Sequence, residues 1–274
     1  MNEIQAYKMD GLGNDFIIID RRKDKINLSK QQIINIADRK KGPGCDQIII
    51  IDKDKEKKSN AKITFYNSDG GETGACGNGS RCISYFLMNE KKLKKTKINT
   101  EGGILKAKLT GKTEVSVDMG IPNFEWKKIP LVKKMNHSKV KVKTKHFGIL
   151  SGYTLSVGNP HIIFFKDITF ELLKKIGPQI EHHEFFPERF NVTFAQVMNK
   201  KNISVKVWER GAGLTLACGT AACATAVAAS KLGLAGKKVN IHFKNGTLHI
   251  EWAKDKHIIM TGSVSNINNI SLKI

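Results

Sequence analysis

Two short apolar runs, each introduced by a Gly-Asn pair, are the clearest feature of the hydrophobic pattern. Gly13-Asn14 precedes an apolar run at residues 16–19, and Gly158-Asn159 precedes another at residues 162–165. Glycine and asparagine favour turns, and a short apolar run is typical of a buried strand, so each segment is predicted to be a tight turn that leads into a buried strand. Further short runs predict strands at residues 106–109, 115–118, 140–142, 239–243 and 248–252.

The same pattern is repeated around two cysteines. In each case a strand-like segment enters a Gly-rich loop; the first loop ends in Ala75-Cys76-Gly77 and the second in Ala217-Cys218-Gly219. Asn67 precedes Cys76 by nine positions, and Glu209 precedes Cys218 by the same nine. A pattern that matches both at the Gly-Asn turns and at the cysteine loops indicates two homologous halves.

The segments that follow the two cysteines are predicted to be helices. Residues 80–87 and 221–230 contain small and apolar side chains and no proline, and the second segment is rich in alanine. Helices of this composition are typical of those buried inside a sheet or barrel. Each cysteine is therefore predicted to lie where a Gly-rich loop becomes the first turn of a buried helix. Residues 119–122 are predicted to link the two halves.

Length and composition indicate a folded protein. The 274 residues are enough for two domains, and 40% of them are hydrophobic. The first ten residues lack the apolar segment of a secretory signal, and the sequence has no run of roughly 18 apolar residues. A cytoplasmic protein without a membrane partner is therefore expected.

The charge balance is strongly basic, with 46 Lys and Arg against 25 Asp and Glu and a formal net charge of +21. A nucleic-acid-binding protein would gather such charge on one face, with aromatic side chains between the basic ones. Here the lysines are scattered through loops at residues 53–58, 91–97 and 133–145, mixed with Asp, Glu, Ser and Asn. A solvated surface is the favoured interpretation, and no nucleic-acid partner is expected.

The cysteine content gives no support to a disulfide framework or a metal site. The number of cysteines is odd, no export signal is evident, and neither a Cys-x-x-Cys pair nor a His-rich cluster is present. Cys45, Cys82 and Cys223 are interpreted as small buried residues.

Cys76 and Cys218 are predicted to be catalytic because both would lie at helix N-termini. The N–H groups and positive dipole end of a helix start lower the pKa of a thiol toward neutrality and attract a carboxylate. Two such starts that face one another would hold an α-carboxylate between two thiols. One thiolate could then remove the α-proton while the opposed thiol protonates the other face, which inverts the carbon. His161 is either a supporting residue at this site or a core histidine.

Together these motifs resemble the diaminopimelate epimerase family along almost the whole chain. The matching segments are MDGLGNDF at 9–16, GCDQ at 44–47, Asn67 with the DG at 69–70, CGNG at 76–79, GNPH at 158–161, FPERFNV at 186–192, WERG at 208–211 and ACGT at 217–220. The resemblance implies an α+β fold (an α/β roll) of two pseudo-symmetric domains, each a β-barrel-like sheet around a central helix, with the active site in the cleft between them. It also implies a first domain of residues 1–118 joined by the C-terminal strand 264–274, and a second domain of residues 119–263.

The resemblance further implies the reaction and the residues that bind the substrate. The two cysteines would be the acid/base pair that interconverts LL- and meso-2,6-diaminopimelate in lysine biosynthesis, without pyridoxal phosphate, any other cofactor or a metal. Polar residues would hold the two amino-acid ends of this small-molecule substrate: Asn14, Gln47, Asn67, Asn159, Asn191, Glu209 and Arg210. Backbone amides would receive a carboxylate at Gly77, Asn78, Gly219 and Thr220. A homodimer is expected, since this state is usual in the family.

One departure from the family pattern lies in the second cysteine loop, where Leu214 follows Gly213 and an acidic residue is usual. This change leaves the hydrogen bonding of the loop and the fine substrate preference open. The alternative function is that of a related cofactor-independent racemase acting on another amino acid, such as histidine or proline. Such an enzyme would keep the cysteine pair but would not need the residues that bind the far end of diaminopimelate.

Overall fold

The computed structural model describes residues 3–24, 26–74 and 76–274 and divides the chain into two compact units. Unit 1 consists of Met1–Asp118 and Thr261–Ile274, and unit 2 of Met119–Met260. Ala75, which belongs to the first Ala-Cys-Gly motif, lies outside the described residues. Both units combine helices with a mixed sheet, so the predicted α+β class is confirmed.

In unit 1, two parallel strand pairs are each connected through a helix. β2 (Asn14–Asp20) pairs with β3 (Gln47–Asp52) across α1 (Lys30–Ala37), and β4 (Ala61–Asn67) pairs with β6 (Lys95–Thr100) across α2 (Gly77–Glu90). The other pairs are antiparallel: β1 (Glu3–Gly11) with β2, β3 with β4, β4 with β5 (Glu72–Thr73), β6 with β7 (Gly103–Leu109), and β7 with β8 (Glu114–Asp118).

Unit 2 repeats this order of connections. β11 (Pro160–Phe164) is parallel to β12 (Asn191–Asn199) across α3 (Phe170–Glu181), and β13 (Asn202–Glu209) is parallel to β15 (Lys238–Phe243) across α4 (Gly219–Lys231). The antiparallel pairs join β9 (Val140–Thr144) to β10 (Gly148–Ser156), β10 to β11, β12 to β13, β13 to β14 (Gly213–Thr215), and β15 to β16 (Gly246–Trp252). β17 (Ile258–Ser263) crosses the boundary between the units.

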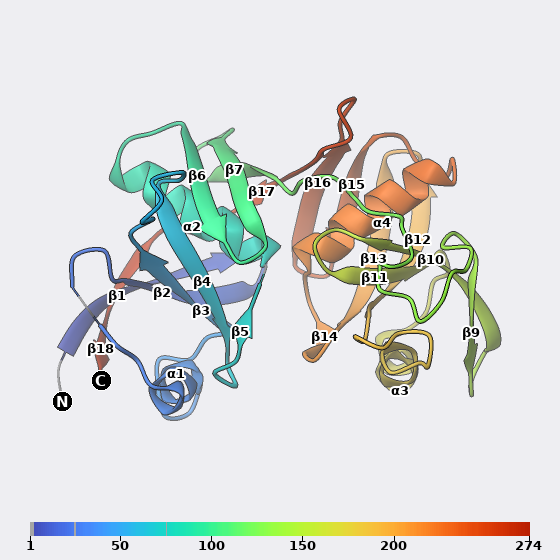
Figure 1. Cartoon of the computed structure of the whole chain (residues 1–274), viewed down its shortest axis with the longest axis horizontal. Helices are drawn as coiled ribbons and strands as arrows, with labels where there is room; N and C mark the ends of the chain where they lie inside the picture. The colour runs from blue at the N-terminus through green and yellow to red at the C-terminus, as the bar shows by residue number, and fades with distance from the viewer. Residues whose placement is uncertain (1–2, 25, 75) are drawn as a thin grey trace. The chain divides into compact units, whose positions relative to one another are not determined.

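The helix that follows each cysteine lies inside the curve of its own sheet (Figure 1). α2 contacts β1, β2, β6, β7 and β8, and α4 contacts β10, β11, β12, β15 and β16. Residues 219–229 of α4 are all buried, as are most residues of α2. In α4, alanine and other small side chains make this possible, because they let the helix approach strands on several sides, whereas α2 buries larger apolar side chains as well. The predicted buried helices are therefore confirmed.

The other two helices pack on the outside of the sheets and are absent from the sequence-based prediction. α1 begins with a capping box, in which Ser29 Oγ accepts the N–H of Gln32 and the Gln32 side chain accepts the N–H of Ser29. Its Ile33 and Ile36 pack into the apolar core of unit 1. α3 contributes Leu173, Ile176 and Ile180, spaced for one helix face, to the core of unit 2.

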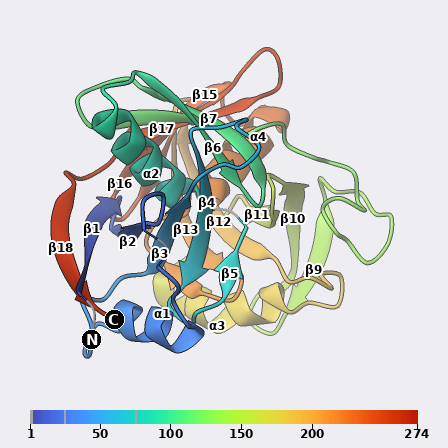
Figure 2. The same ribbon diagram turned by 60° about the vertical axis from the view of Figure 1, so that its left-hand side comes forward.

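The chain returns to unit 1 at its C-terminal end. β18 (Asn268–Lys273) pairs antiparallel with β1, from Glu3 opposite Lys273 to Lys8 opposite Asn268, and lies beside it in Figure 2. Ser265 also exchanges two hydrogen bonds with the Asp10 backbone, both 2.8 Å long. In the described part of the chain, none of the helices has the length and apolar character needed to span a membrane.

Candidate active site

Cys76 is the N-cap residue of α2 and contacts Asn14, the first residue of β2. Its backbone is extended (φ −139°, ψ 107°), and its Sγ accepts the N–H of Gly79 at 3.3 Å. Such an N–H bond stabilises negative charge on sulfur. The same Sγ lies 3.9 Å from Oδ1 of Asn14, and Nδ2 of Asn78 lies 3.5 Å from that oxygen. Cys76, Asn14 and Asn78 therefore form one cluster in unit 1.

The orientation of the Asn14 amide is set by Asp46. Nδ2 of Asn14 donates to Oδ2 of Asp46 at 2.8 Å, and Oδ1 of Asp46 accepts from Arg39 at 2.7 Å. Because its amide nitrogen is bound to Asp46, Asn14 turns its carbonyl oxygen toward the Cys76 thiol. Asp46 is absent from the predicted site residues, and its position directly before Gln47 is the one sequence signal that could have suggested it.

Gln47 and Asn67 lie opposite one another at the neighbouring ends of β3 and β4. Nε2 of Gln47 donates to Oδ1 of Asn67 at 2.8 Å. Oε1 of Gln47 is buried and has no hydrogen-bond partner among the described residues. A buried amide oxygen without a partner is a ready acceptor for a ligand N–H group.

Cys218 begins α4 with the same backbone conformation as Cys76 (φ −139°, ψ 114°). Its Sγ lies 3.4 Å from Oγ1 of Thr220, and Nδ2 of Asn159 donates to that hydroxyl oxygen at 3.3 Å. Asn159 comes from the second Gly-Asn turn. Each cysteine is thus linked to the asparagine of its own half, directly in unit 1 and through Thr220 in unit 2.

The predicted lowering of the thiol pKa is wrong for Cys218. The residue is only 4% exposed, and its burial raises the pKa of the thiol well above the ordinary value. The Glu209 carboxylate, in hydrogen-bond contact with the thiol, raises this pKa further. The Thr220 hydroxyl and the Ala221 N–H act in the opposite direction but do not compensate. Desolvation and a neighbouring negative charge raise the pKa of the thiol by more than the N–H groups at the helix start lower it, so Cys218 carries its proton at neutral pH.

His161 is fully buried and bonded to the site asparagine of unit 2. Its Nε2 lies 2.9 Å from Oδ1 of Asn159, and because that oxygen can only accept, Nε2 carries the proton. Nδ1 has no hydrogen-bond partner in the described part of the chain. Burial, aided by the positive charge of Arg210, lowers the pKa of His161 to about 3. The ring is therefore neutral and supports Asn159.

Asn191 fixes the backbone of the segment that carries Glu209 and Arg210. Its Nδ2 donates to the Pro160 carbonyl at 2.9 Å, and its Oδ1 accepts the Arg210 N–H at 3.0 Å. Nη1 of Arg210 donates to the Glu188 carbonyl at 3.2 Å. Asn191 therefore holds two neighbouring strand ends in register.

The predicted residues fall into two clusters, one in each unit. Unit 1 contributes Asn14, Gln47, Asn67, Cys76, Gly77 and Asn78, at the ends of β2, β3 and β4 and the start of α2. Unit 2 contributes Asn159, His161, Asn191, Glu209, Arg210, Cys218, Gly219 and Thr220, at the corresponding places. Among the described residues, no group of His, Cys, Asp and Glu is arranged to hold a metal ion.

Comparison with known proteins agrees with this duplicated arrangement. The family model for diaminopimelate epimerase matches residues 6–125 and 153–267. A diaminopimelate epimerase of Pelagibacter ubique (strain HTCC1062) is 50% identical, over 99% of this chain and 100% of its own length. That of Caulobacter vibrioides (strain NA1000 / CB15N) is 42% identical, over 94% of this chain and 93% of its own length. The chain belongs to the diaminopimelate epimerase family.

Solved structures with low sequence identity share the fold of this family member. A probable proline racemase from Agrobacterium radiobacter K84 superposes with a TM-score of 0.76 at 12% identity, covering 99% of this chain and 93% of the other. A hydroxyproline epimerase from Agrobacterium vitis, solved with bound trans-4-hydroxy-L-proline, gives 0.69 at 13% identity, covering 99% and 91%. Both support the two-unit α+β architecture.

The position at which this chain departs from the family pattern is apolar for a structural reason. Leu214 in β14 lies opposite Trp208 in β13, and both pack against the core of unit 2. An acidic side chain there would face apolar groups.

The three remaining cysteines, Cys45, Cys82 and Cys223, are buried as well, and burial raises the pKa of Cys45 to about 12.

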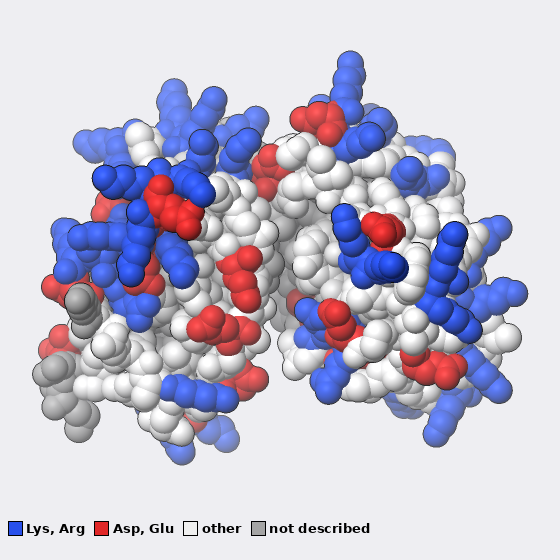
Figure 3. Space-filling model, viewed as in Figure 1, with Lys and Arg blue, Asp and Glu red and all other residues white. Residues whose placement is uncertain are grey.

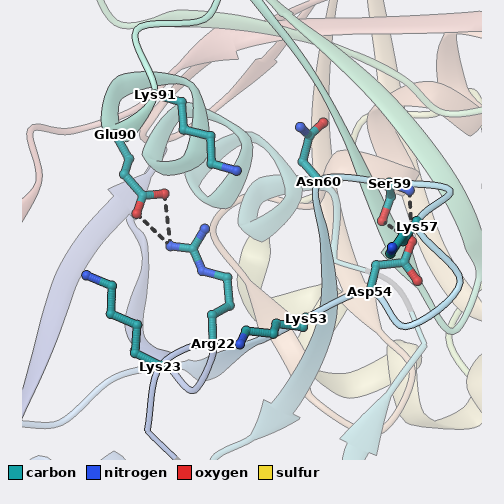
Figure 4. A pocket seen from close by; sticks show the side chains of 9 residues that line it. All are labelled: Arg22, Lys23, Lys53, Asp54, Lys57, Ser59, Asn60, Glu90 and Lys91. Carbon is teal, nitrogen blue, oxygen red and sulfur yellow. Dashed lines mark hydrogen bonds and ion pairs between the residues drawn. The ribbon is translucent and has the colours of Figure 1, made fainter.

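A separate hollow of about 670 Å³ lies at the opposite end of α2 from Cys76. Figure 4 shows its lining, which is Arg22, Lys23, Lys53, Asp54, Lys57, Ser59, Asn60, Glu90 and Lys91. Arg22 donates to Glu90 at 2.9 Å across one side of this hollow.

On the face of the molecule in Figure 3, Lys and Arg are spread over both units with Asp and Glu among them, as expected for a solvated surface.

Proposed function

We propose that the protein interconverts LL- and meso-2,6-diaminopimelate, with Cys76 and Cys218 as its two acid/base groups and without pyridoxal phosphate or another cofactor. Family membership supports the reaction, since the related chain from Pelagibacter ubique matches along its whole length. One observation carries the mechanism. Each half places one cysteine at the start of a buried helix, with the same backbone conformation in both halves.

The two thiols would take unequal roles before the substrate reacts. Burial and Glu209 keep Cys218 protonated, which suits it to donate a proton. The position equivalent to Glu209 in unit 1 is the neutral Asn67, and the Gly79 N–H supports negative charge on Cys76. Cys76 would therefore remove the α-proton while Cys218 protonates the opposite face. The two sulfurs then exchange protonation states, which prepares the site for the reverse direction.

The rest of each cluster would bind the substrate and stabilise charge on its α-carboxylate. The helix starts at Gly77, Asn78, Gly219 and Thr220 provide N–H groups oriented toward an anion. The buried Oε1 of Gln47 would accept from a substrate ammonium group, and Arg210 would bind a carboxylate. This scheme requires the two clusters to meet across a shared cleft, which is part of the proposal.

Incubation of LL-diaminopimelate in heavy water tests the proposal. Deuterium should appear at the inverted α-carbon, and Cys76→Ala and Cys218→Ala should each abolish inversion. Cys223→Ala is the matched control, because Cys223 is buried in the same helix as Cys218 but outside the proposed chemistry. Full turnover by either active-site variant would refute the two-base scheme. Racemisation of L-proline or L-histidine without turnover of diaminopimelate would favour the alternative function.

Family membership also supports a homodimer that works in the cytoplasm in lysine biosynthesis. The chain has a mass of 30.5 kDa, so light scattering after size exclusion should give twice that value. A mass of one chain across the working concentration range would contradict the dimer without affecting the proposed chemistry.

A further inference from the structure

Glu181, the last residue of α3, has a carboxylate that is buried and has no part in the proposed chemistry. The residue is 3% exposed. Its Oε2 accepts the indole N–H of Trp208 at 2.7 Å, and its Oε1 accepts the backbone N–H of Gly211 at 2.9 Å. Trp208 and Gly211 directly flank Glu209 and Arg210 in the sequence. A single carboxylate therefore holds both ends of the segment that bears two of the predicted site residues.

The residue type at position 181 is what this arrangement requires. Two N–H donors converge on the side chain, so it must offer two acceptors and no donor, as a carboxylate does. In the described part of the chain, no lysine or arginine forms an ion pair with it, and Nδ1 of His182 lies 4.0 Å from Oε2. A buried carboxylate needs hydrogen bonds to offset its loss of water, and these two bonds supply them.

The segment held by Glu181 is also fixed against α3. A Cβ atom added to Gly177 would lie 2.6 Å from Cγ of Trp208, so the indole ring rests directly on the helix backbone. Gly211 has φ of +74°, a conformation that favours glycine and that turns its N–H toward Glu181. The Arg210 N–H is bound in turn by Asn191. The segment therefore has little freedom to shift relative to α3.

We propose that Glu181 is a positioning residue that holds Glu209 in contact with the thiol of Cys218. Glu181 acts through the segment between Trp208 and Gly211, which has Glu209 next to one of its anchors. Its effect on epimerisation rests on the proposed function, but its effect on the geometry around Cys218 does not. The two can therefore be tested separately.

The test follows the ionisation of Cys218 without substrate. Protein labelled with [3-¹³C]cysteine has five cysteine signals, and loss of one in Cys218→Ala assigns the signal of interest. Glu181→Asp keeps the charge but is one methylene too short to reach both donors. Its Cys218 signal should titrate at lower pH than in the unsubstituted protein, because Glu209 moves away from the sulfur. Glu184→Asp, an exposed acidic residue three positions further on, is the control and should leave the titration unchanged.

A second pair of variants separates geometry from charge and covers a failure of Glu181→Asp to fold. In Glu181→Gln the amide nitrogen must oppose one N–H donor, so the titration should again move to lower pH. In Glu181→Gln combined with Trp208→Phe, the opposing donor is removed and the bond to Gly211 can reform, so the titration should return toward that of the unsubstituted protein. If Glu181→Asp titrates normally, or if the double variant shifts as far as Glu181→Gln, the proposal is overturned.

Epimerase activity supplies the readout that depends on the proposed function. Glu181→Asp should lower kcat on the order of tenfold with a smaller change in KM, because misplacement of Glu209 affects the proton donor more than substrate binding. The unsubstituted protein could lack epimerase activity while Glu181→Asp still shifts the titration of Cys218. That result would uphold the positioning role of Glu181 and refute the proposed function.

Discussion

Replacement of His161 by phenylalanine is predicted to make unit 2 less sensitive to acid. His161 is fully buried, and its pKa is lowered to about 3, whereas a histidine in the unfolded chain titrates near 6.5. Below pH 6.5 the unfolded chain therefore binds a proton that the folded protein does not, and stability is lost as the pH falls toward 3. Phenylalanine is a reasonable substitute because Phe16 occupies the equivalent place in unit 1, opposite the first residue of the neighbouring parallel strand.

The size of the effect follows from the two pKa values. The shift from 6.5 to about 3 lowers the free energy of unfolding by about 2 kcal/mol between pH 7.5 and pH 5, and the slope steepens from about 0.1 to about 1.3 kcal/mol per pH unit across that range. His161→Phe should lack this slope. At pH 7.5 this variant should be less stable by about 1 kcal/mol, because Oδ1 of Asn159 loses the hydrogen bond from His161. Asp15 and Asp20 have pKa values below the ordinary value for aspartate, so the stability that they contribute is lost only as the pH falls below about 5, and this loss is common to both proteins.

Urea unfolding followed by tryptophan fluorescence is a suitable assay, because all three tryptophans, Trp126, Trp208 and Trp252, lie in unit 2 together with His161. The free energy of unfolding would be measured at pH 7.5 and at pH 5 for both proteins. A decline between these pH values that is equally steep with and without the histidine would show that His161 is not held neutral, and the reasoning would fail.

Three further substitutions test separate contacts. Gly79→Ala should lower the free energy of unfolding in urea by roughly 1 kcal/mol, because the new Cβ would lie 2.8 Å from Phe65. The same Cβ would lie 3.3 Å from the Cys76 sulfur, so the ¹³C titration of Cys76 should change. An unchanged titration would contradict this. Glu209→Gln should move the titration of Cys218 to lower pH, since the carboxylate is a cause of its raised pKa; no movement would leave burial as the sole cause. Leu214→Glu should destabilise unit 2 by about 1–3 kcal/mol in the fluorescence assay, because it would place a carboxylate against an apolar core; full stability would show that the acidic residue usual in the family fits here.

The two buried helices could be predicted from the sequence, whereas the two outer ones were not. α2 and α4 follow a repeated Gly-rich motif, begin with small residues and carry mostly small or apolar side chains, so both their positions and their burial are visible locally. α1 has a readable capping box at Ser29 and Gln32 but is only eight residues long. α3 has apolar residues at helical spacing, but Pro178 near its end suggests a break. Tertiary packing of one apolar face stabilises both outer helices in spite of these weak local signals.

The candidate site was predictable where it depends on the repeat and unpredictable where it depends on contacts across the fold. The cysteines and the Gly-Asn turns stand out because they occur twice. Asp46 contacts Asn14 from 32 positions away, and Glu181 contacts Gly211 from 30 positions away, and neither separation leaves a pattern in the sequence. The direction predicted for the pKa shift of Cys218 was wrong for the same reason. The local rule for helix starts contains neither the burial of the sulfur nor the approach of Glu209.

Divergence between the two halves is as important to the proposed reaction as their similarity. An exact repeat would give two thiols with equal proton affinity, and neither would be predisposed to act as base or acid. The proposed inversion needs one deprotonated and one protonated sulfur at the same time. The chain has a neutral Asn67 in one half and Glu209 at the equivalent place in the other, where burial and the Glu209 carboxylate together raise the pKa of Cys218. In the proposed reaction, deeper burial and a carboxylate in one copy of the duplicated site would therefore give two equivalent cysteines different tasks.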